Sequence, residues 1–412
     1  MVQLLNLWNH SNPPLGFAQP FTVDGQVKTL DHEIIEYDSL NDVLDDLEKR
    51  GITGFMRYKA VNRYVALKAR YNDTPVSGSF ELTPLCNFDC KMCYVHLKPE
   101  QLKPDESLLT INEWKTIIRQ AVDAGMMYAT LTGGECLTYP GFKEIYLYLV
   151  SLGIQPDVLT NGRLLTKEMI DFFVKYPPGS IQVTIYGSCE EAYEAVTGHR
   201  AFQQVIDGIT RVKEAELNLF LTVSPSIYMK NDVKALLDFI HSLNVPYAIG
   251  EATLKARDET GRDINEYAVD LHTLMEINAI EQDFYRSASS TTAISRFPRY
   301  LPKKKRKLVG LLCGGAHSTF HVNWRGDVCP CIGFAETVRV NAFENGFAEA
   351  LKQVQERMRS YMPPEECQKC TLEEHCAVCP AEKTYGSIHG QLNTNVCQRI
   401  KRKNPQVREI EC

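Results

Sequence analysis

The chain has 412 residues, of which 44% are hydrophobic and 23% charged, and its formal net charge is −6 at pH 7. This length suits a catalytic domain with one or two smaller domains, and the composition is that of a globular protein. The acidic balance argues against nucleic acid or an anionic membrane as a partner, and the N-terminus lacks the basic and long apolar segments of a secretion signal or membrane span. We therefore expect a cytoplasmic protein.

Residues 1–75 contain no cysteine and have two predicted helices. The first begins after a cap at Ser39 and ends near Gly51, and the second is expected over 55–71. We interpret this region as a structural lead-in, because its strand signals are weak. Recognition of a leader peptide is the alternative.

From residue 79 onward, short apolar strands alternate with helices. This alternation predicts six β/α units with parallel strands and right-handed crossovers, hence an α/β sheet or barrel. Residues 251–312 are expected to form a mainly helical connection after it. The predicted strands are 79–83, 128–132, 157–160, 181–186, 217–223 and 247–250, and the helices between them are 111–124, 142–152, 166–176, 201–215 and 232–243.

Three cysteines, Cys86, Cys90 and Cys93, follow the first of these strands in a CxxxCxxC pattern. Chemistry in such folds lies at the C-terminal ends of the strands. A loop this short can bring three thiolates to three corners of an iron–sulfur cube, which leaves the fourth iron open to a substrate or cofactor. Structural zinc is the alternative, but zinc usually takes four protein ligands in two close pairs.

The motif and the order of elements over residues 79–250 resemble the radical S-adenosylmethionine (SAM) superfamily. That family has CxxxCxΦC followed, one β/α unit later, by a GGE turn on a partial (β/α)6 barrel, and this chain has Gly133, Gly134 and Glu135 at that turn. The resemblance implies that the cysteines hold a [4Fe–4S] cluster and that the turn binds the SAM amino group. SAM would then be cleaved to a 5′-deoxyadenosyl radical that takes hydrogen from a substrate carbon.

Four further residues are assigned to the SAM site by this resemblance. Met92 stands where the family usually has an aromatic residue beside the adenine, and a polarisable thioether can keep that contact. Asn161 ends a predicted strand at the same edge of the sheet as the cysteines. The family's Asp after the fourth strand is missing, so Ser188 and Arg200 become the candidates for the SAM carboxylate or ribose.

The C-terminal cysteines resemble the SPASM domain found in many radical SAM enzymes, although the spacing from Cys376 to Cys379 is one residue shorter than usual. The resemblance implies two auxiliary [4Fe–4S] clusters, and so three clusters in all. Cys329 is an extra thiol that can complete the first auxiliary cluster, and a zinc knuckle over 367–379 is the alternative. The implied ligands are Cys313, Cys331 and Cys379 for the first auxiliary cluster and Cys367, Cys370, Cys376 and Cys397 for the second.

The predicted fold is therefore α/β, with a partial (β/α)6 TIM-like barrel over residues 76–250. Residues 1–75 precede it, 251–312 connect it to the next domain, and 313–412 form a cysteine-rich iron–sulfur domain. We expect an oxidoreductase-type maturase that forms a thioether or carbon–carbon crosslink in a ribosomally made peptide, with ferredoxin or flavodoxin as electron donor. The alternatives are an anaerobic sulfatase-maturing, formylglycine-forming enzyme, a small-molecule radical SAM dehydrogenase or epimerase, and a zinc-stabilised binding protein.

Overall fold

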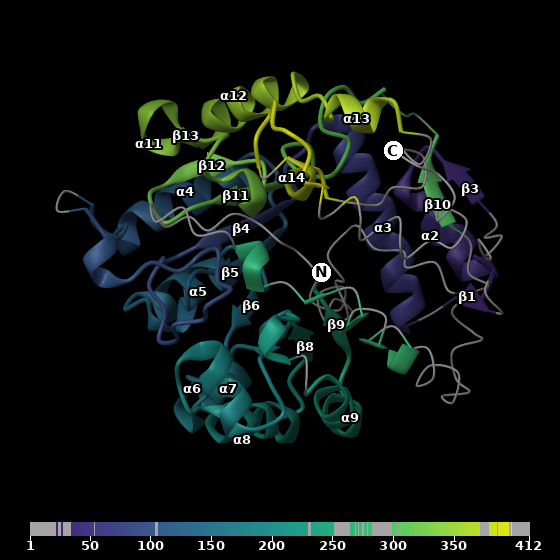
Figure 1. The fold of residues 1–412 in the computed structure, drawn as a ribbon. Coiled ribbons are helices and arrows are strands. Elements are labelled where there is room, and N and C mark those ends of the chain that lie inside the picture. Colours follow the sequence, from purple (N-terminus) through teal and green to yellow (C-terminus); the bar gives the residue numbers. More distant parts are fainter. Residues whose placement is uncertain are drawn as a thin grey trace.

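The computed structural model describes residues 22–397 apart from short gaps and three longer ones, 251–263, 282–298 and 371–378. A nine-stranded sheet runs through it in the order β13-β12-β11-β4-β5-β6-β7-β8-β9. Helices cover the outer face of the curved part of this sheet (Figure 1). No helix among the described residues is long and apolar enough to cross a membrane.

Six parallel strands in sequence order form the main part of the sheet, as the alternating pattern predicted. The α/β fold class is therefore confirmed. Within the described residues the sheet stays open, because β9 and β13 are its two ends. The six strands are β4 (Ser77–Glu81), β5 (Tyr128–Thr132), β6 (Asp157–Thr160), β7 (Ile181–Ile185), β8 (Leu219–Val223) and β9 (Tyr247–Ile249).

The crossover helices form where periodic apolar residues and N-terminal caps predicted them. The Thr110 hydroxyl accepts from Glu113 N at 3.3 Å and the Glu113 carboxylate accepts from Thr110 N at 2.7 Å, which is a complete capping box. One helix was missed: α7 (Glu190–Thr197) lies between β7 and α8 and ends at Gly198, whose φ is +72°. The predicted ones are α4 (Ile111–Asp123), α5 (Phe142–Ser151), α6 (Lys167–Lys175), α8 (Phe202–Glu214) and α9 (Val233–Leu243).

The N-terminal region contains more strand than its sequence indicated. Strand β3 (Ile34–Tyr37) pairs in parallel with β10 (Arg299–Pro302), which lies inside the segment expected to be mainly helical. Tyr300 is buried there and donates to Asp46 at 2.8 Å. A strand whose partner is so distant has no local signal. The other elements of this region are β1 (Thr22–Val23), β2 (Gln26–Val27), α2 (Leu40–Lys49) and α3 (Gly54–Asn72).

The C-terminal segment extends the central sheet. Strand β11 (Thr319–Val322) pairs in parallel with β4, and Phe320 packs its ring 6.0 Å from that of Phe80. On the other face, His321 contacts Ser79 at 2.7 Å and Glu81 at 3.1 Å. The remaining elements are β12 (Asp327–Cys329), β13 (Val340–Asn341), α11 (Ala342–Asn345), α12 (Phe347–Arg359), α13 (Glu365–Gln368), α14 (Pro380–Lys383) and the 3-10 turns η1 (Pro99–Gln101), η2 (Cys136–Thr138), η3 (Ile227–Met229), η4 (Ile264–Tyr267) and η6 (Ile332–Phe334).

Asp157, the first residue of β6, makes the stability of the sheet depend on pH. Its Oδ1 accepts from Ser180 Oγ at 2.7 Å, and burial raises the pKa of its carboxyl to about 6. Because the folded state holds this proton more tightly than the unfolded chain does, stability falls as the pH rises from about 4 to about 6. We expect Asp157→Asn to raise the free energy of unfolding by about 1–2 kcal/mol at about pH 7.5 and by almost nothing near pH 4. Denaturant titrations at both pH values test this, and equal effects would contradict it.

Candidate active site

The cysteine loop after β4 is held from outside by the end of α7. Asp89 N donates to Thr197 O at 2.9 Å, and Lys91 N donates to Val196 O at 3.1 Å. These two backbone bonds fix the loop between its first and third cysteines. Helix α7, which the sequence patterns did not predict, therefore positions the cysteines, which they did predict.

The turn after β5 lies directly against the chain that leads into the cysteine loop. Gly134 N donates to Thr83 O at 2.8 Å, and Glu135 N donates to Leu85 O at 2.9 Å. A Cβ atom on Gly134 would lie 2.5 Å from the carbonyl oxygens of Leu85 and Pro84, so only glycine allows this approach. The two motifs that the sequence placed one β/α unit apart thus touch through their backbones.

Glu135 is fully buried and accepts hydrogen bonds from its own turn and from the end of β6. Its Oε1 accepts from Leu137 N at 3.0 Å and from Thr160 Oγ1 at 2.9 Å, while Oε2 accepts from Asn161 N at 2.7 Å. Burial raises the pKa of Glu135, and these bonds oppose that effect. Each carboxylate oxygen has two lone pairs. Oε2 can therefore accept a second bond, as from an ammonium group.

Asn161 links the two motifs through its side chain as well. Its Nδ2 donates to Asn87 Oδ1 at 2.7 Å and lies 3.6 Å from Cys86 Sγ, while its backbone N holds Glu135. Asn161 was predicted as a cofactor residue from its place at a strand end. Asn87 was not singled out, although its position directly after the first cysteine was the available signal.

The three thiols of the loop lie close enough to affect one another. Burial, together with the neighbouring Glu135 carboxylate, raises the pKa of Cys86 to about 12. Burial also raises the pKa of Cys90, with added contributions from Cys93 and Cys86. Thiolates that are buried and mutually repelling need a compensating cationic centre, and a [4Fe–4S] cluster binds such a donor set.

No group of three Cys, His, Asp or Glu side chains in the described part of the chain is arranged around the position of one shared metal ion. Thiolates that bind separate irons of one cluster do not need such an arrangement, because each reaches a different corner of the cube. The chemistry of the donor set therefore fits an iron–sulfur cluster.

Ser188 and Arg200 are both held by carboxylates outside the Cys86–Asn161–Glu135 network. Ser188 N donates to Asp232 at 2.9 Å, and its hydroxyl donates to the same carboxylate. Arg200 is half exposed and pairs with Glu191 at 2.7 Å and Glu194 at 3.0 Å. A contact of either residue with SAM stays a prediction. Met92 is partly buried and packs against the main hydrophobic core. Its contact with the adenine of SAM stays a prediction as well.

The C-terminal cysteines include one group whose members affect one another. The pKa of Cys331 is raised to about 12 by burial and further by Cys379 and Cys313. Burial also raises the pKa of Tyr361, and the neighbouring Cys367, Cys379 and Cys313 raise it as well. The structure thus brings together the three residues that the resemblance implied for the first auxiliary cluster. That ligand set stays a prediction.

The other C-terminal cysteines give less information. Cys329 is fully buried, and its Sγ donates to the carbonyl oxygens of Asp327 at 3.5 Å and Ala335 at 3.8 Å. Cys370 and Cys397 are partly buried. Cys376 lies outside the described residues. The ligand set implied for the second auxiliary cluster therefore stays a prediction.

Known proteins match mainly the barrel. Residues 80–240 match the profile of the radical SAM superfamily. The antilisterial bacteriocin subtilosin biosynthesis protein AlbA of Bacillus subtilis is 28% identical over 159 residues, which are 38% of this chain and 34% of AlbA. The sporulation killing factor maturation protein SkfB of the same organism is 24% identical over 187 residues, 43% of this chain and 44% of SkfB. The chain therefore spans less than half the length of these two relatives.

Two further similarities cover more of the chain. The AdoMet-dependent heme synthase of Methanosarcina barkeri is 25% identical over 321 residues, 74% of this chain and 90% of that protein. The crystal structure of Streptococcus suis SuiB bound to S-adenosylmethionine has a TM-score of 0.60 at 16% identity and covers 87% of each chain, so it shares the fold. Radical SAM proteins bind SAM and a [4Fe–4S] cluster, for which the donor set after β4 is suited. Residues 80–240 of this chain therefore form a radical SAM domain.

Proposed function

We propose that this chain cleaves SAM reductively at the Cys86, Cys90 and Cys93 loop and uses the product to take hydrogen from a substrate carbon. When bound, the cluster supplies the electron that converts SAM to a 5′-deoxyadenosyl radical. The observation that carries the proposal is the buried network that joins Cys86 to Glu135 through Asn161. This network supports the proposal because it connects the proposed cluster ligand Cys86 to the proposed acceptor for the SAM ammonium, Glu135.

Each residue of this network has a separate task. Gly134 lets the turn approach the backbone of residues 84–85, which sets how near bound SAM lies to the cysteine loop. Glu135 accepts from the SAM ammonium through Oε2, a charge-assisted bond that is strong in a site without water. Asn161 contacts both Glu135 and Cys86 and so holds them in position relative to each other. Met92 is the candidate for packing against the adenine.

For the substrate we propose a ribosomally made peptide, oxidised to a thioether or carbon–carbon crosslink. The names of AlbA and SkfB connect those relatives to peptide products, and SuiB has been crystallised with its precursor peptide SuiA. The group formed by Cys313, Cys331 and Cys379 suits an auxiliary cluster that accepts the electron left after hydrogen abstraction. Together with the second implied set, this would give three clusters, working with ferredoxin or flavodoxin in the cytoplasm.

A small molecule is the second candidate substrate. It is favoured by one observation: the match to the heme synthase of Methanosarcina barkeri extends over 74% of this chain, well beyond the barrel. A radical SAM dehydrogenase would use the same SAM site, so the two candidates differ only in what occupies the space beyond it.

Anaerobic reconstitution with iron and sulfide tests the proposal in two steps. With three clusters we expect about twelve irons per chain, broad absorption near about 400 nm, and 5′-deoxyadenosine from SAM and dithionite. Short peptides encoded beside the gene are then added, and mass spectrometry checks for the loss of two hydrogens. Turnover of a small molecule instead would favour the second candidate. A colourless protein with stoichiometric zinc would contradict both.

A further inference from the structure

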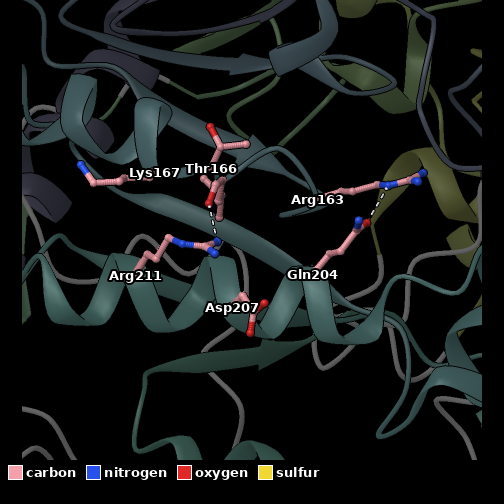
Figure 2. Close-up of a pocket in the computed structure, with 7 residues that line it drawn as sticks. Arg163, Thr166, Lys167, Gln204, Asp207 and Arg211 are labelled. Carbon is pink, nitrogen blue, oxygen red and sulfur yellow. Dashed lines mark hydrogen bonds between the residues drawn. The ribbon is translucent and has the colours of Figure 1, made fainter.

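A cationic cavity lies beside the cysteine loop, on the outer side of the sheet. Its volume is about 210 Å³, and Figure 2 shows the loop after β6, the start of α6 and the facing side of α8 around it. Arg163, Lys167 and Arg211 supply three positive charges to its lining, and Asp207 supplies one negative charge. The cavity therefore has a net positive charge.

The two arginines of this cavity have only neutral acceptors among the described residues. Arg163 donates to Gln204 at 3.1 Å and to Asn87 O at 2.8 Å, and Arg211 donates to Leu165 O at 3.3 Å. Lys167 pairs with Asp171, but its side chain is 84% exposed and such pairs are weak.

Several other exposed cations on the neighbouring helices pair with a carboxylate. They include Arg119 with Asp123, Lys143 with Glu168 and Arg200 with Glu191. Uncompensated guanidinium groups around one cavity fit carboxylates supplied from outside.

Arg163 connects the cavity to the cysteine loop. The carbonyl that it contacts belongs to Asn87, the residue after Cys86, and its guanidinium lies 5.5 Å from the ring of Phe88. The same loop also carries Cys90 and Cys93. Only one side chain therefore separates an occupant of the cavity from the backbone that carries the cluster ligands.

The position of the cavity decides which occupant it suits. It is lined by the start of α6 and by α8, helices that cover the outer face of the sheet (Figure 1), and no residue of the Cys86–Asn161–Glu135 network belongs to its lining, so a substrate carbon held there would not contact that network. An electron needs no such contact, because it can cross a thin layer of protein.

This inference rests on the proposed function. We propose that an acidic protein that donates one electron docks at this cavity. Its surface carboxylates bind Lys167 and Arg211, and the electron enters the protein beside Arg163. The donor is oxidised by one electron and the cluster on Cys86, Cys90 and Cys93 is reduced by one, with no atom or proton transferred. The positive cavity also speeds encounter with an acidic partner, and salt weakens that effect.

The test compares two reductants on the reconstituted enzyme: dithionite, and flavodoxin kept reduced by its NADPH-dependent reductase. Lys167→Glu combined with Arg211→Gln should raise the flavodoxin concentration for half-maximal 5′-deoxyadenosine formation at least about tenfold. The rate with dithionite should not change. Lys352→Glu on α12, whose side chain is 63% exposed, is a charge-reversal control away from the cavity and should change neither rate.

Three results would overturn the docking proposal. One is an unchanged flavodoxin dependence in the double variant, and another is an equal loss in Lys352→Glu. The third is a raised KM for a peptide substrate with flavodoxin dependence intact, which would assign the cavity to the peptide. Absence of 5′-deoxyadenosine from the unmodified enzyme with dithionite would instead contradict the proposed function.

Discussion

Replacement of Cys86, Cys90 and Cys93 together by Ala is expected to lower the rate of 5′-deoxyadenosine formation more than about a thousandfold, because the bond cleavage depends on the cluster that we propose these thiols hold. The iron content should fall by about four atoms per chain, the content of one cubane cluster. Iron analysis and chromatography of the SAM products measure both effects. The C-terminal group of Cys313, Cys331 and Cys379 belongs to other elements and should keep its iron.

Cys189→Ala is the matched control for this variant. Cys189 is a partly buried thiol directly before α7 and has no assigned role, so its loss should change neither iron nor activity. If the triple variant lost all of its iron, the sites would not be independent. If it kept full activity, the SAM-cleaving site would have to lie elsewhere.

Glu135→Gln is expected to weaken SAM binding by about 2–4 kcal/mol, or roughly 30- to 1000-fold. The substitution keeps the volume of a fully buried side chain but removes the negative charge that we propose faces the SAM ammonium. It also turns one acceptor oxygen into a donor, which then opposes either Asn161 N or the pair of donors at Oε1. Calorimetry of SAM binding to the anaerobic holoenzyme measures the loss.

Glu144→Gln on α5 is the control for Glu135→Gln, because that side chain is 54% exposed and bonds only to Lys115 among the described contacts. It should leave the affinity for SAM unchanged. Iron content should be preserved in both variants, which separates a loss of SAM binding from a loss of the cluster. An unchanged affinity in Glu135→Gln would remove this carboxylate from the SAM site.

Local patterns predicted most of the six β/α units because their elements carry local sequence signals. The Thr110 capping box is a contact within a few residues, and the strand at 128–132 shows alternating burial although its pairing partners, β4 and β6, are distant in the sequence. The same logic predicted that the cysteine loop and Glu135 would lie close together, because parallel strands bring their C-terminal ends to one edge of the sheet. The backbone bonds between the two motifs agree with that expectation.

Local patterns missed the features that depend on distant partners. Strand β10 forms on β3, and β11 forms on β4 with Phe320 against Phe80. Helix α7 is only eight residues long, and short helices carry little periodicity. Arg163 stood out in no motif, since its contact with Asn87 joins two separate strand ends.

The sequence by itself determined the strand and helix order of the barrel, the three cysteines after the first strand and the glycine turn after the second. These depend on residue type, spacing and short-range contacts. Only the tertiary structure decided that Asn161 joins Cys86 to Glu135, that Ser188 and Arg200 are held by carboxylates, and that Arg163 leads from the cysteine loop to a cationic cavity. Except for the Arg200 pairs, which form within one crossover, these contacts join residues from different crossovers, and such contacts are set by how the strands align in the sheet.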